Sequence, residues 1–346
     1  MFKKIISSAL ACVMALGCAL SCFAAQEGDL QVITTEISAP QKIIFLGDSI
    51  PAGFGLEGYT DNGVKPQTSY PSILESKYKK ELEGVCDCKM INLAVSGDTS
   101  SQLWQKVGNG NFDTNLLASD VVVVSIGGND IMEPILEFIY NDLKMTNKDQ
   151  FKTFDTSKLN SSEIMPKLNA TMEKVTANIT TFKSNLAKTI QTLHKKTEGT
   201  LIIQTVYNPL DSNPSYATFS AMIGAKINDV NSIIKENAAD NNYLVCDVAE
   251  AFKNKSTQYT NITDFDIHPN AEGHKVIADL VDQLVKQKKY KYEELKATIN
   301  EVPDDSDSSS AKKMSKNEIY ITLGLFFGGF FVLIVVVTII FKKKTK

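Results

Sequence analysis

The chain has 346 residues, of which 43% are hydrophobic, and its formal net charge at pH 7 is −4. A charge this small argues against a general nucleic-acid-binding protein, because such proteins usually carry a strongly basic surface. The length allows one sizeable core with flanking segments. We therefore expect one globular domain over residues 40–290 and no nucleic acid among its partners.

The N-terminus has the pattern of an export signal. Lys3 and Lys4 come before an uncharged apolar run over residues 5–20, and two small alanines follow at the end of the segment. The run is short for a membrane span and rich in small residues, which is typical of a signal peptide rather than of an anchor or a buried helix. We predict a signal peptide over residues 1–25, and leave open whether it is cleaved or lipidated.

The C-terminus carries a second apolar run. A polar linker over residues 300–318 precedes residues 319–341, which contain no charged side chain, and four lysines follow within residues 342–346. As a helix, this run would reach about 34 Å and would cross a hydrocarbon core of about 30 Å. Positive residues mark the cytoplasmic side. We predict a single-pass protein of the cell membrane with a transmembrane helix at 319–341, a cytoplasmic tail at 342–346 and an extracellular domain.

Between these ends, short apolar runs alternate with segments of helical periodicity. The runs predict strands at residues 42–46, 90–95, 121–126, 201–206 and 243–248. The periodic segments predict helices at residues 70–82, 99–107, 166–193, 216–239 and 271–284. Continuous apolar strands are typical of parallel sheets buried on both faces. The alternation predicts an α/β fold of three layers, with a parallel sheet between two layers of helices. Residues 141–165 are polar and do not fit it, so we expect an insertion there.

Four chemically suggestive clusters follow the first, second, third and fifth predicted strands. They are Gly47-Asp48-Ser49, Ser96-Gly97-Asp98, Gly127-Gly128-Asn129-Asp130 and His268-Pro269-Asn270. Any one of them alone could be an ordinary turn. In open parallel α/β sheets, however, ligands bind beyond the carboxyl ends of the strands. We therefore expect the four clusters to meet at one edge of the sheet.

These clusters resemble the four signature blocks of the SGNH (GDSL) hydrolase family, in the family's order. The matching stretches are residues 43–49, 92–99, 126–130 and 267–270. Within the family, residues 96–100 are similar to the lysophospholipase, thioesterase and arylesterase-like branch. The resemblance implies a flavodoxin-like SGNH hydrolase fold and a serine ester hydrolase that uses neither a cofactor nor a metal.

The resemblance also implies roles for individual residues. Ser49 would be the nucleophile and His268 the base, since a serine hydroxyl is a poor nucleophile until a base takes its proton. The oxyanion would be stabilised by the backbone N–H groups of Ser49 and Gly97 and by the side-chain amide of Asn129. Each such donor contributes roughly 3 kcal/mol to the stabilisation of the transition state in comparable sites.

The sequence departs from the family at the acid that orients the histidine. The family usually places this acid three residues before the histidine, and here that position is Phe265. Asp264 and Asp266 flank it, and either could bind the other ring nitrogen of His268. We favour Asp266, with Asp264 as the alternative acid; a backbone carbonyl could also serve.

The substrate stays open between two kinds of ester. The family implies either an acyl lipid, as for a lysophospholipase or acyl esterase, or an O-acetylated carbohydrate. The alternative is a non-catalytic surface module that binds glycans or lipids on the same scaffold.

Of the remaining histidines, we expect His194 to end the long helix and His274 to lie at the surface or beside the site. Three cysteines beyond the signal read as structural, and the oligomeric state stays open.

Overall fold

The computed structural model describes residues 29–60, 63, 65–147, 149–150, 153–298, 322–324 and 334–336. The predicted signal at 1–25, the linker at 300–318 and the tail at 342–346 lie outside the described residues. Residues Glu36–Tyr290 form one compact unit, which contains all four clusters of the sequence analysis.

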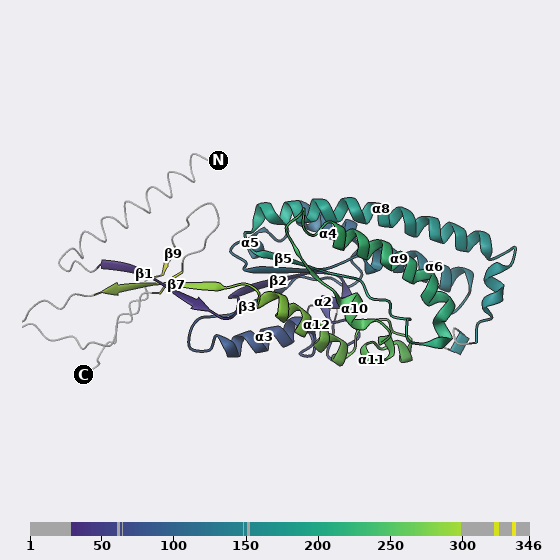
Figure 1. Cartoon of the computed structure of the whole chain (residues 1–346), viewed down its shortest axis with the longest axis horizontal. Helices are drawn as coiled ribbons and strands as arrows, with labels where there is room; N and C mark the ends of the chain where they lie inside the picture. Colours follow the sequence, from purple (N-terminus) through teal and green to yellow (C-terminus); the bar gives the residue numbers. More distant parts are fainter. Residues whose placement is uncertain are drawn as a thin grey trace, which may run out of the picture. The chain divides into compact units, whose positions relative to one another are not determined.

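A five-stranded parallel sheet forms the middle of this unit (Figure 1). Its strands are hydrogen-bonded in the order β3-β2-β4-β5-β6. The strands are β2 (Lys42–Gly47), β3 (Lys89–Asn92), β4 (Val121–Ser125), β5 (Thr200–Gln204) and β6 (Leu244–Cys246). In register, Ile43 lies beside Val121, and Val122 lies beside Leu201. The β-branched side chains fit a pleated surface that is buried on both sides, and the predicted parallel sheet is confirmed.

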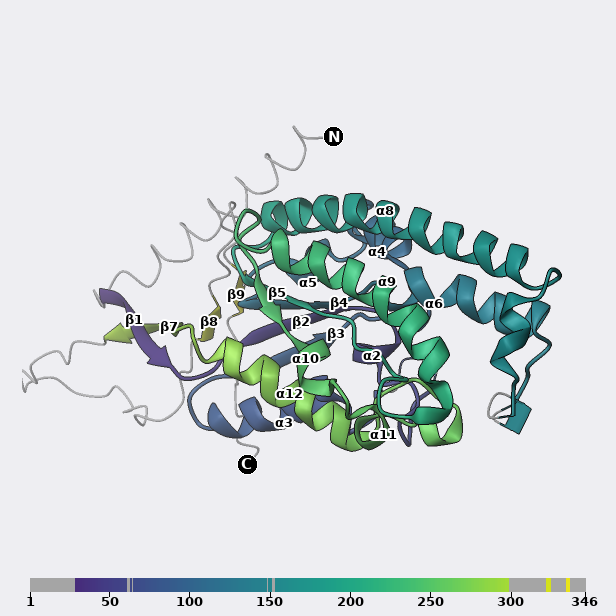
Figure 2. The same cartoon turned by 45° about the vertical axis from the view of Figure 1, so that its right-hand side comes forward.

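Helices cover both faces of the sheet, as Figures 1 and 2 show. On one face α3 (Tyr70–Glu81) packs against α12 (Ala271–Val285). On the other face α8 (Met165–Lys196) packs against α4 (Ser100–Gly108) and α9 (Ala217–Glu236). The arrangement confirms the predicted α/β fold of three layers.

Successive side chains of β2 face the two helix layers in turn. Ile44 and Leu46 belong to the buried cluster that includes the apolar side chains of α8. Phe45 points the other way, and its ring packs edge-on against Tyr70 of α3 at 5.5 Å. Successive side chains of a strand face opposite sides, and each fully buried one contributes roughly 1.5–3 kcal/mol to stability.

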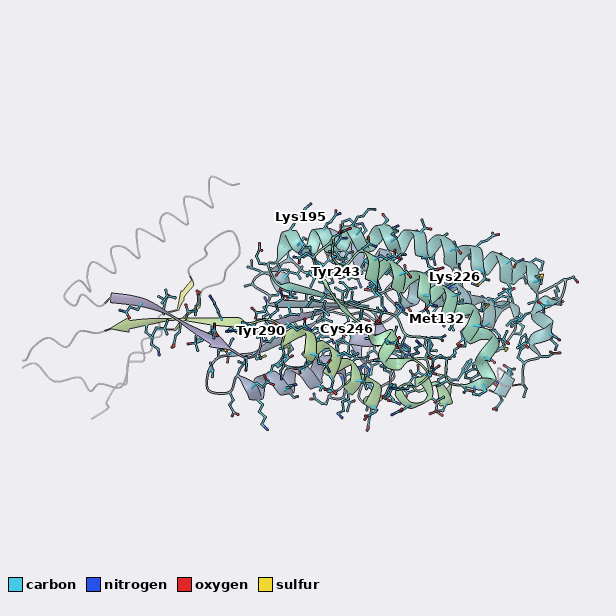
Figure 3. The ribbon with its side chains drawn as sticks, viewed as in Figure 1. Met132, Lys195, Lys226, Tyr243, Cys246 and Tyr290 are labelled. Atoms are coloured by element: carbon cyan, nitrogen blue, oxygen red, sulfur yellow. The ribbon has the colours of Figure 1, made fainter. Side chains whose placement is uncertain are left out.

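The long helix α8 buries the stripe that its periodicity predicts. Its buried residues include Val175, Ile179, Phe182, Leu186, Ile190 and Leu193, at spacings of three and four. Its last turn contains His194, Lys195 and Lys196, where positive charge suits the helix dipole. Lys195 is exposed (Figure 3). The helix ends at Thr197, whose backbone is extended.

Several short elements were not predicted. They are α2 (Ser49–Ala52), α5 (Asp113–Leu116), α6 (Gly128–Glu137), α10 (Val248–Phe252), α11 (Ser256–Tyr259), and 3-10 turns at Pro214–Tyr216 and Ile262–Asp264. The expected insertion at 141–165 begins within a π-helical turn, Phe138–Asp142, and contains a 3-10 turn at Thr156–Asn160. Met145 and Leu159 from this segment are buried in the core. Because the segment is mostly polar, the sequence did not indicate that these two residues would be buried.

Strands also occur outside the sheet. β1 (Asp29–Ile37) pairs with β7 (Tyr290–Thr298), a ribbon that the sequence analysis did not predict. β8 (Thr322–Gly324) pairs antiparallel with β9 (Ile334–Val336). These six residues fall within the predicted transmembrane helix, and the structure places them in strands instead. An apolar, β-branched run fits a strand as well as a helix, and periodicity cannot separate the two.

The rest of the predicted transmembrane segment lies outside the described residues. Among the helices of the described ranges, none combines the length and the apolar character that crossing a membrane requires.

His274 differs from its expected place at the surface or beside the site, because it is fully buried beneath α3. It is 0% exposed, and its Nδ1 accepts a hydrogen bond from the backbone N–H of Tyr70 at 3.3 Å. Burial, together with the nearby charge of His268, lowers the pKa of His274 to about 3. The imidazole is therefore neutral at physiological pH and serves the packing between α12 and α3.

Candidate active site

Ser49 lies where strand β2 turns into α2. The turn needs glycine at Gly47, because its φ is +131° and a Cβ there would lie 1.8 Å from the carbonyl oxygen of Ser125. Asp48 then caps α2 by accepting a hydrogen bond from the N–H of Ile50 at 3.0 Å. Ser49 begins the helix, so its own N–H has no acceptor within α2. This N–H is available to a developing negative charge.

The structure brings Ser49, His268 and Asp266 into one hydrogen-bonded chain. Ser49 Oγ lies 2.9 Å from His268 Nε2, and His268 Nδ1 lies 2.5 Å from Asp266 Oδ1. An ionised carboxylate only accepts hydrogen bonds, so Nδ1 donates to Asp266. In the neutral ring Nε2 is then the acceptor, and it can take the proton of the Ser49 hydroxyl.

The contact to Nδ1 comes from Asp266, the acid that the sequence analysis favours over Asp264. The 3-10 turn at Ile262–Asp264 ends at Phe265, whose backbone is left-handed with φ +66°. The chain turns there, and Asp266 then accepts hydrogen bonds from both the ring and the backbone N–H of His268. Burial acts to raise the pKa of Asp266, but these bonds, the charge of His268 and a bond from Asn261 outweigh it, so the pKa lies below its usual value.

The loop that carries His268 is held by further contacts. The N–H of Asn261 donates to the carbonyl of His268 at 2.9 Å, and the Tyr207 hydroxyl donates to the carbonyl of Ile267 at 2.7 Å. The Phe54 ring packs on the imidazole, with ring centroids 4.5 Å apart. His268 is thereby fixed from three sides.

The two other predicted oxyanion donors come from neighbouring strand ends. Asn129 is the second residue of α6, and it lines the same pocket as Ser49 and His268. One N–H of its amide donates to the carbonyl of Asp98 at 2.9 Å, which leaves the second N–H for a ligand. Gly97 adjoins Asp98, has φ +86°, and faces open space where a Cβ would stand. It is not among the residues that line the pocket, and its role as a donor stays a prediction.

The pocket beside Ser49 is mostly apolar. Its cavity volume is about 60 Å³, within about 670 Å³ of empty space that includes the part open to solvent. Apolar lining comes from Ile50, Ile126, Ile131, Met132, Val206, Pro209, Ile227, Val248 and Ile267. Met132 comes from α6 (Figure 3). These residues could not be identified from the sequence, because an apolar side chain that lines a pocket has the same pattern as one in the core.

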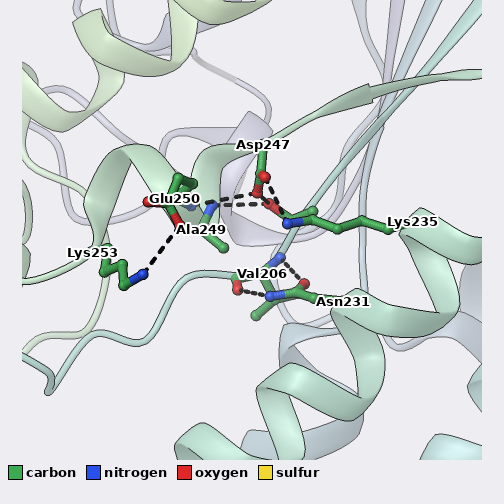
Figure 4. A network of polar contacts seen from close by, with 8 residues as sticks. Val206, Asn231, Lys235, Asp247, Ala249, Glu250 and Lys253 are labelled. Atoms are coloured by element: carbon green, nitrogen blue, oxygen red, sulfur yellow. Dashed lines mark hydrogen bonds and ion pairs between the residues drawn. The ribbon is translucent and has the colours of Figure 1, made fainter.

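Thr205 and Val206 line one wall of this pocket, and polar side chains of α9 and of Asp247, which caps α10, hold them. Figure 4 shows these polar contacts. The Asn231 amide both donates to the carbonyl of Val206 and accepts from its N–H, each at 2.8 Å. Beside it, Asp247 accepts from the Thr205 hydroxyl at 2.9 Å and pairs with Lys235 at 2.6 Å. The segment after β5 therefore keeps a defined shape against the pocket.

Asp48 is buried beneath the nucleophile and also lines the pocket. Burial raises the pKa of Asp48 to about 7, against the opposing effect of the hydrogen bond from Ile50. Within the described ranges there is no group of three or more His, Cys, Asp or Glu side chains that could hold a metal ion. The groups gathered here suit acyl transfer: a hydroxyl, a base with its acid, and N–H donors.

Comparison with known proteins places this geometry in a family. The sequence profile of the GDSL-like lipase/acylhydrolase family matches residues 45–276, which is more than half of the chain. An uncharacterized protein of Bacillus subtilis, YpmR, is 23% identical over 299 residues, covering 82% of this chain and 96% of that protein.

Two solved structures show the same fold at low identity. The phospholipase A1 of Streptomyces albidoflavus is 19% identical with a TM-score of 0.51, covering 72% of this chain and 100% of its own. The extracellular lipase of Streptomyces rimosus is 18% identical with a TM-score of 0.50, covering 70% of this chain and 98% of its own. With the profile match, they confirm the resemblance seen in the sequence: the chain belongs to the GDSL-like lipase/acylhydrolase (SGNH) family and is a serine ester hydrolase.

Proposed function

We propose that this enzyme hydrolyses carboxylic esters of acyl lipids, with the acyl chain bound in the pocket beside Ser49. The apolar lining of that pocket carries the proposal. A pocket whose walls are mainly aliphatic favours a hydrocarbon chain by the hydrophobic effect, at roughly 0.8 kcal/mol for each buried methylene. An acetyl group would leave most of these walls without contact.

The reaction proceeds in two halves at Ser49. As its Oγ bonds to the ester carbonyl carbon, His268 Nε2 takes the hydroxyl proton, and the carbonyl oxygen becomes an oxyanion beside the Ser49 N–H and the Asn129 amide. When the oxyanion collapses, the bond to the leaving alcohol breaks and the imidazolium returns its proton to that alcohol. Water then repeats the sequence on the acyl-enzyme and releases the carboxylic acid.

Asp266 supports both halves of this reaction. Its carboxylate holds Nδ1 as the donor, so Nε2 stays free to accept from Ser49, and its negative charge stabilises the imidazolium that forms. The lowered pKa of Asp266 means that this charge is present at neutral pH. The same arrangement argues against a non-catalytic binding module, which would need no such chain of hydrogen bonds.

Two proteins of the same fold are a lipase and a phospholipase A1, which agrees with the choice of acyl lipids. We further propose an extracytoplasmic location with a membrane tether. This is supported by the lysine-led apolar run at 5–20 and the uncharged run at 319–341 before four lysines. Protease treatment of intact cells is the test: the proposal expects degradation of the hydrolase domain, and full protection would reject it.

Hydrolysis of p-nitrophenyl esters of graded acyl length tests the substrate class. Because two further buried methylenes are worth about tenfold in binding, kcat/KM should rise by about that factor from acetyl to butyryl and again to hexanoyl. Ser49→Ala should abolish turnover, whereas Ser76→Ala, an exposed serine on α3, should leave it unchanged. A preference for acetyl esters would favour O-acetylated carbohydrates instead, and equal turnover by Ser49→Ala would reject the nucleophile.

A further inference from the structure

A buried carboxylate directly after Asn129 has no part in the reaction as described. Asp130 is 3% exposed. Its Oδ2 accepts a hydrogen bond from the backbone N–H of Ser100 at 2.9 Å, and its Oδ1 accepts from the Ser100 hydroxyl at 2.6 Å. Both oxygens of one carboxylate are thus used on Ser100, the first residue of α4, directly after the loop that contains Gly97.

A second bond joins the same two loops closer to the site. The Asn129 amide donates to the backbone carbonyl of Asp98, between Gly97 and Ser100. The Asp98 side chain is itself buried and forms an ion pair with Lys106 of α4. The segment from Gly97 to Ser100 is therefore bonded to the first turn of α6 at two points, and Asp98 is bonded further along α4 at a third.

Two asparagines of helix α8 donate hydrogen bonds to the first turns of α4 and α6. Asn178 donates to the carbonyl of Asp130 at 3.0 Å, and Asn185 donates to the hydroxyls of Ser101 at 2.9 Å and Ser100 at 3.3 Å. The two asparagines are two helical turns apart, on one face and about 10.5 Å along the axis. Asn185 is 6% exposed on a helix face that is mostly apolar. Such a polar group is tolerated there because its hydrogen bonds are satisfied.

We propose that Asp130 is a positioning residue, whose carboxylate fixes the spacing between the Gly97 N–H and the Asn129 amide so that both meet one oxyanion. This inference rests on the proposed ester hydrolysis. Oxyanion donors must lie about 2.7–3.1 Å from the charge, and a displacement of about 1 Å can cost 10²-fold in rate. The Gly97 N–H and the Asn129 amide follow different strands, so a fixed connection between their segments is needed to hold that tolerance.

The variant Asp130→Asn tests the proposal in the full-length enzyme. It keeps the size of the side chain but replaces one accepting oxygen with an NH₂ group that cannot accept. We expect kcat for a p-nitrophenyl ester to fall by about 10- to 100-fold, with KM within about threefold, since the acyl pocket is untouched.

The ratio of turnover between an ester and its thionoester gives a readout that a loss of stability alone would not move. Sulfur is a weaker hydrogen-bond acceptor than oxygen, so well-placed oxyanion donors favour the ester. Asp130→Asn should lower this preference. Ser100→Ala, which loses the hydroxyl bond and keeps the backbone bond, should lower it less and serves if Asp130→Asn does not fold.

Asp282→Asn is the matched control. Asp282 is 8% exposed and accepts bonds from Tyr78 and Lys77, on the layer formed by α3 and α12. It should lower the thermal midpoint and leave the ester preference unchanged. An ester preference in Asp130→Asn and Ser100→Ala equal to that of the wild type would overturn the positioning role. Absence of Ser49-dependent turnover in the wild type would overturn the proposed function, and the positioning role with it.

Discussion

The two sides of Ser49 are built in different ways. On the base side, His268 and Asp266 are two positions apart in one loop, and their own backbone supplies one of the bonds between them. On the oxyanion side, Gly97 and Asn129 follow different strands and are joined through Asp98, Asp130 and the distant helix α8. Local chain geometry suffices for a base and its acid, whereas an oxyanion hole made from separate loops depends on tertiary packing.

The largest loss of kcat should come from replacing His268, the base itself. His268→Gln removes the group that takes the Ser49 proton, so kcat should fall by about 10⁴-fold. Steady-state hydrolysis of the preferred p-nitrophenyl ester measures it. His194→Gln is the control, since His194 lies near the end of α8 and bonds the carbonyl of Asn241. A loss below tenfold in His268→Gln would contradict its role as base.

The next prediction concerns which of the two neighbouring carboxylates, Asp266 or Asp264, orients His268. Asp266→Asn should lower kcat by about 10³-fold, because an amide can no longer hold Nδ1 as the donor or balance the imidazolium charge. Asp264→Asn should change kcat by less than about threefold. Kinetics of both variants with one ester decides the assignment, and a greater loss in Asp264→Asn would reverse it.

On the oxyanion side a single donor should matter less than the base. Asn129→Ala removes the amide that faces the pocket, and kcat should fall by about 10²-fold. It also frees the carbonyl of Asp98, so the thermal midpoint should be recorded with the kinetics. Asn109→Ala, at the exposed end of α4, provides the control. An unchanged kcat in Asn129→Ala would remove this residue from the oxyanion hole.

His274 lies near His268 but takes no part in the reaction, so changing it should affect the stability of the fold and not catalysis. The pKa of His274 is about 3 in the fold, below the ordinary value of 6.5, so between these values the unfolded chain binds the extra proton. Stability is therefore full above about pH 6.5 and is lost as pH falls. Between about pH 7.5 and pH 5 the loss should be about 2 kcal/mol.

Urea unfolding of the wild type and of His274→Gln at these two pH values measures this contribution. The variant should lose less stability than the wild type on acidification, by about 2 kcal/mol. An equal pH dependence in both proteins would show that His274 does not titrate as its burial implies.

The contrast between the two sides also explains what could be predicted. The three middle strands could be predicted because they are continuously apolar, as in β4, where every residue is buried. The edge strands β3 and β6 are only partly buried, and their predicted ranges run past the observed ends. Ser49 and His268 were readable from their motifs. The acid was left between two candidates, because the left-handed backbone at Phe265 decides which carboxylate reaches the ring, and that conformation is uncommon for a phenylalanine.

Other features escaped prediction because they depend on distant partners. Asn178 and Asn185 look like ordinary polar positions of a long helix. Their hydrogen-bond partners, in the first turns of α6 and α4, are far from them in the sequence. Helix α6 was missed since glycine at its start and Pro134 inside it disfavour a helix locally. Tertiary packing overrides that preference and places Asn129 in its first turn.

Covalent capture of the nucleophile tests the central claim most directly. A fluorophosphonate with an alkyl chain should bond to Ser49 Oγ and release fluoride, and mass spectrometry of the digested protein should find the adduct on the peptide that contains Ser49. The account predicts labelling that is absent in Ser49→Ala and strongly slowed in His268→Gln. An adduct on a different residue, or equal labelling of Ser49→Ala, would contradict it.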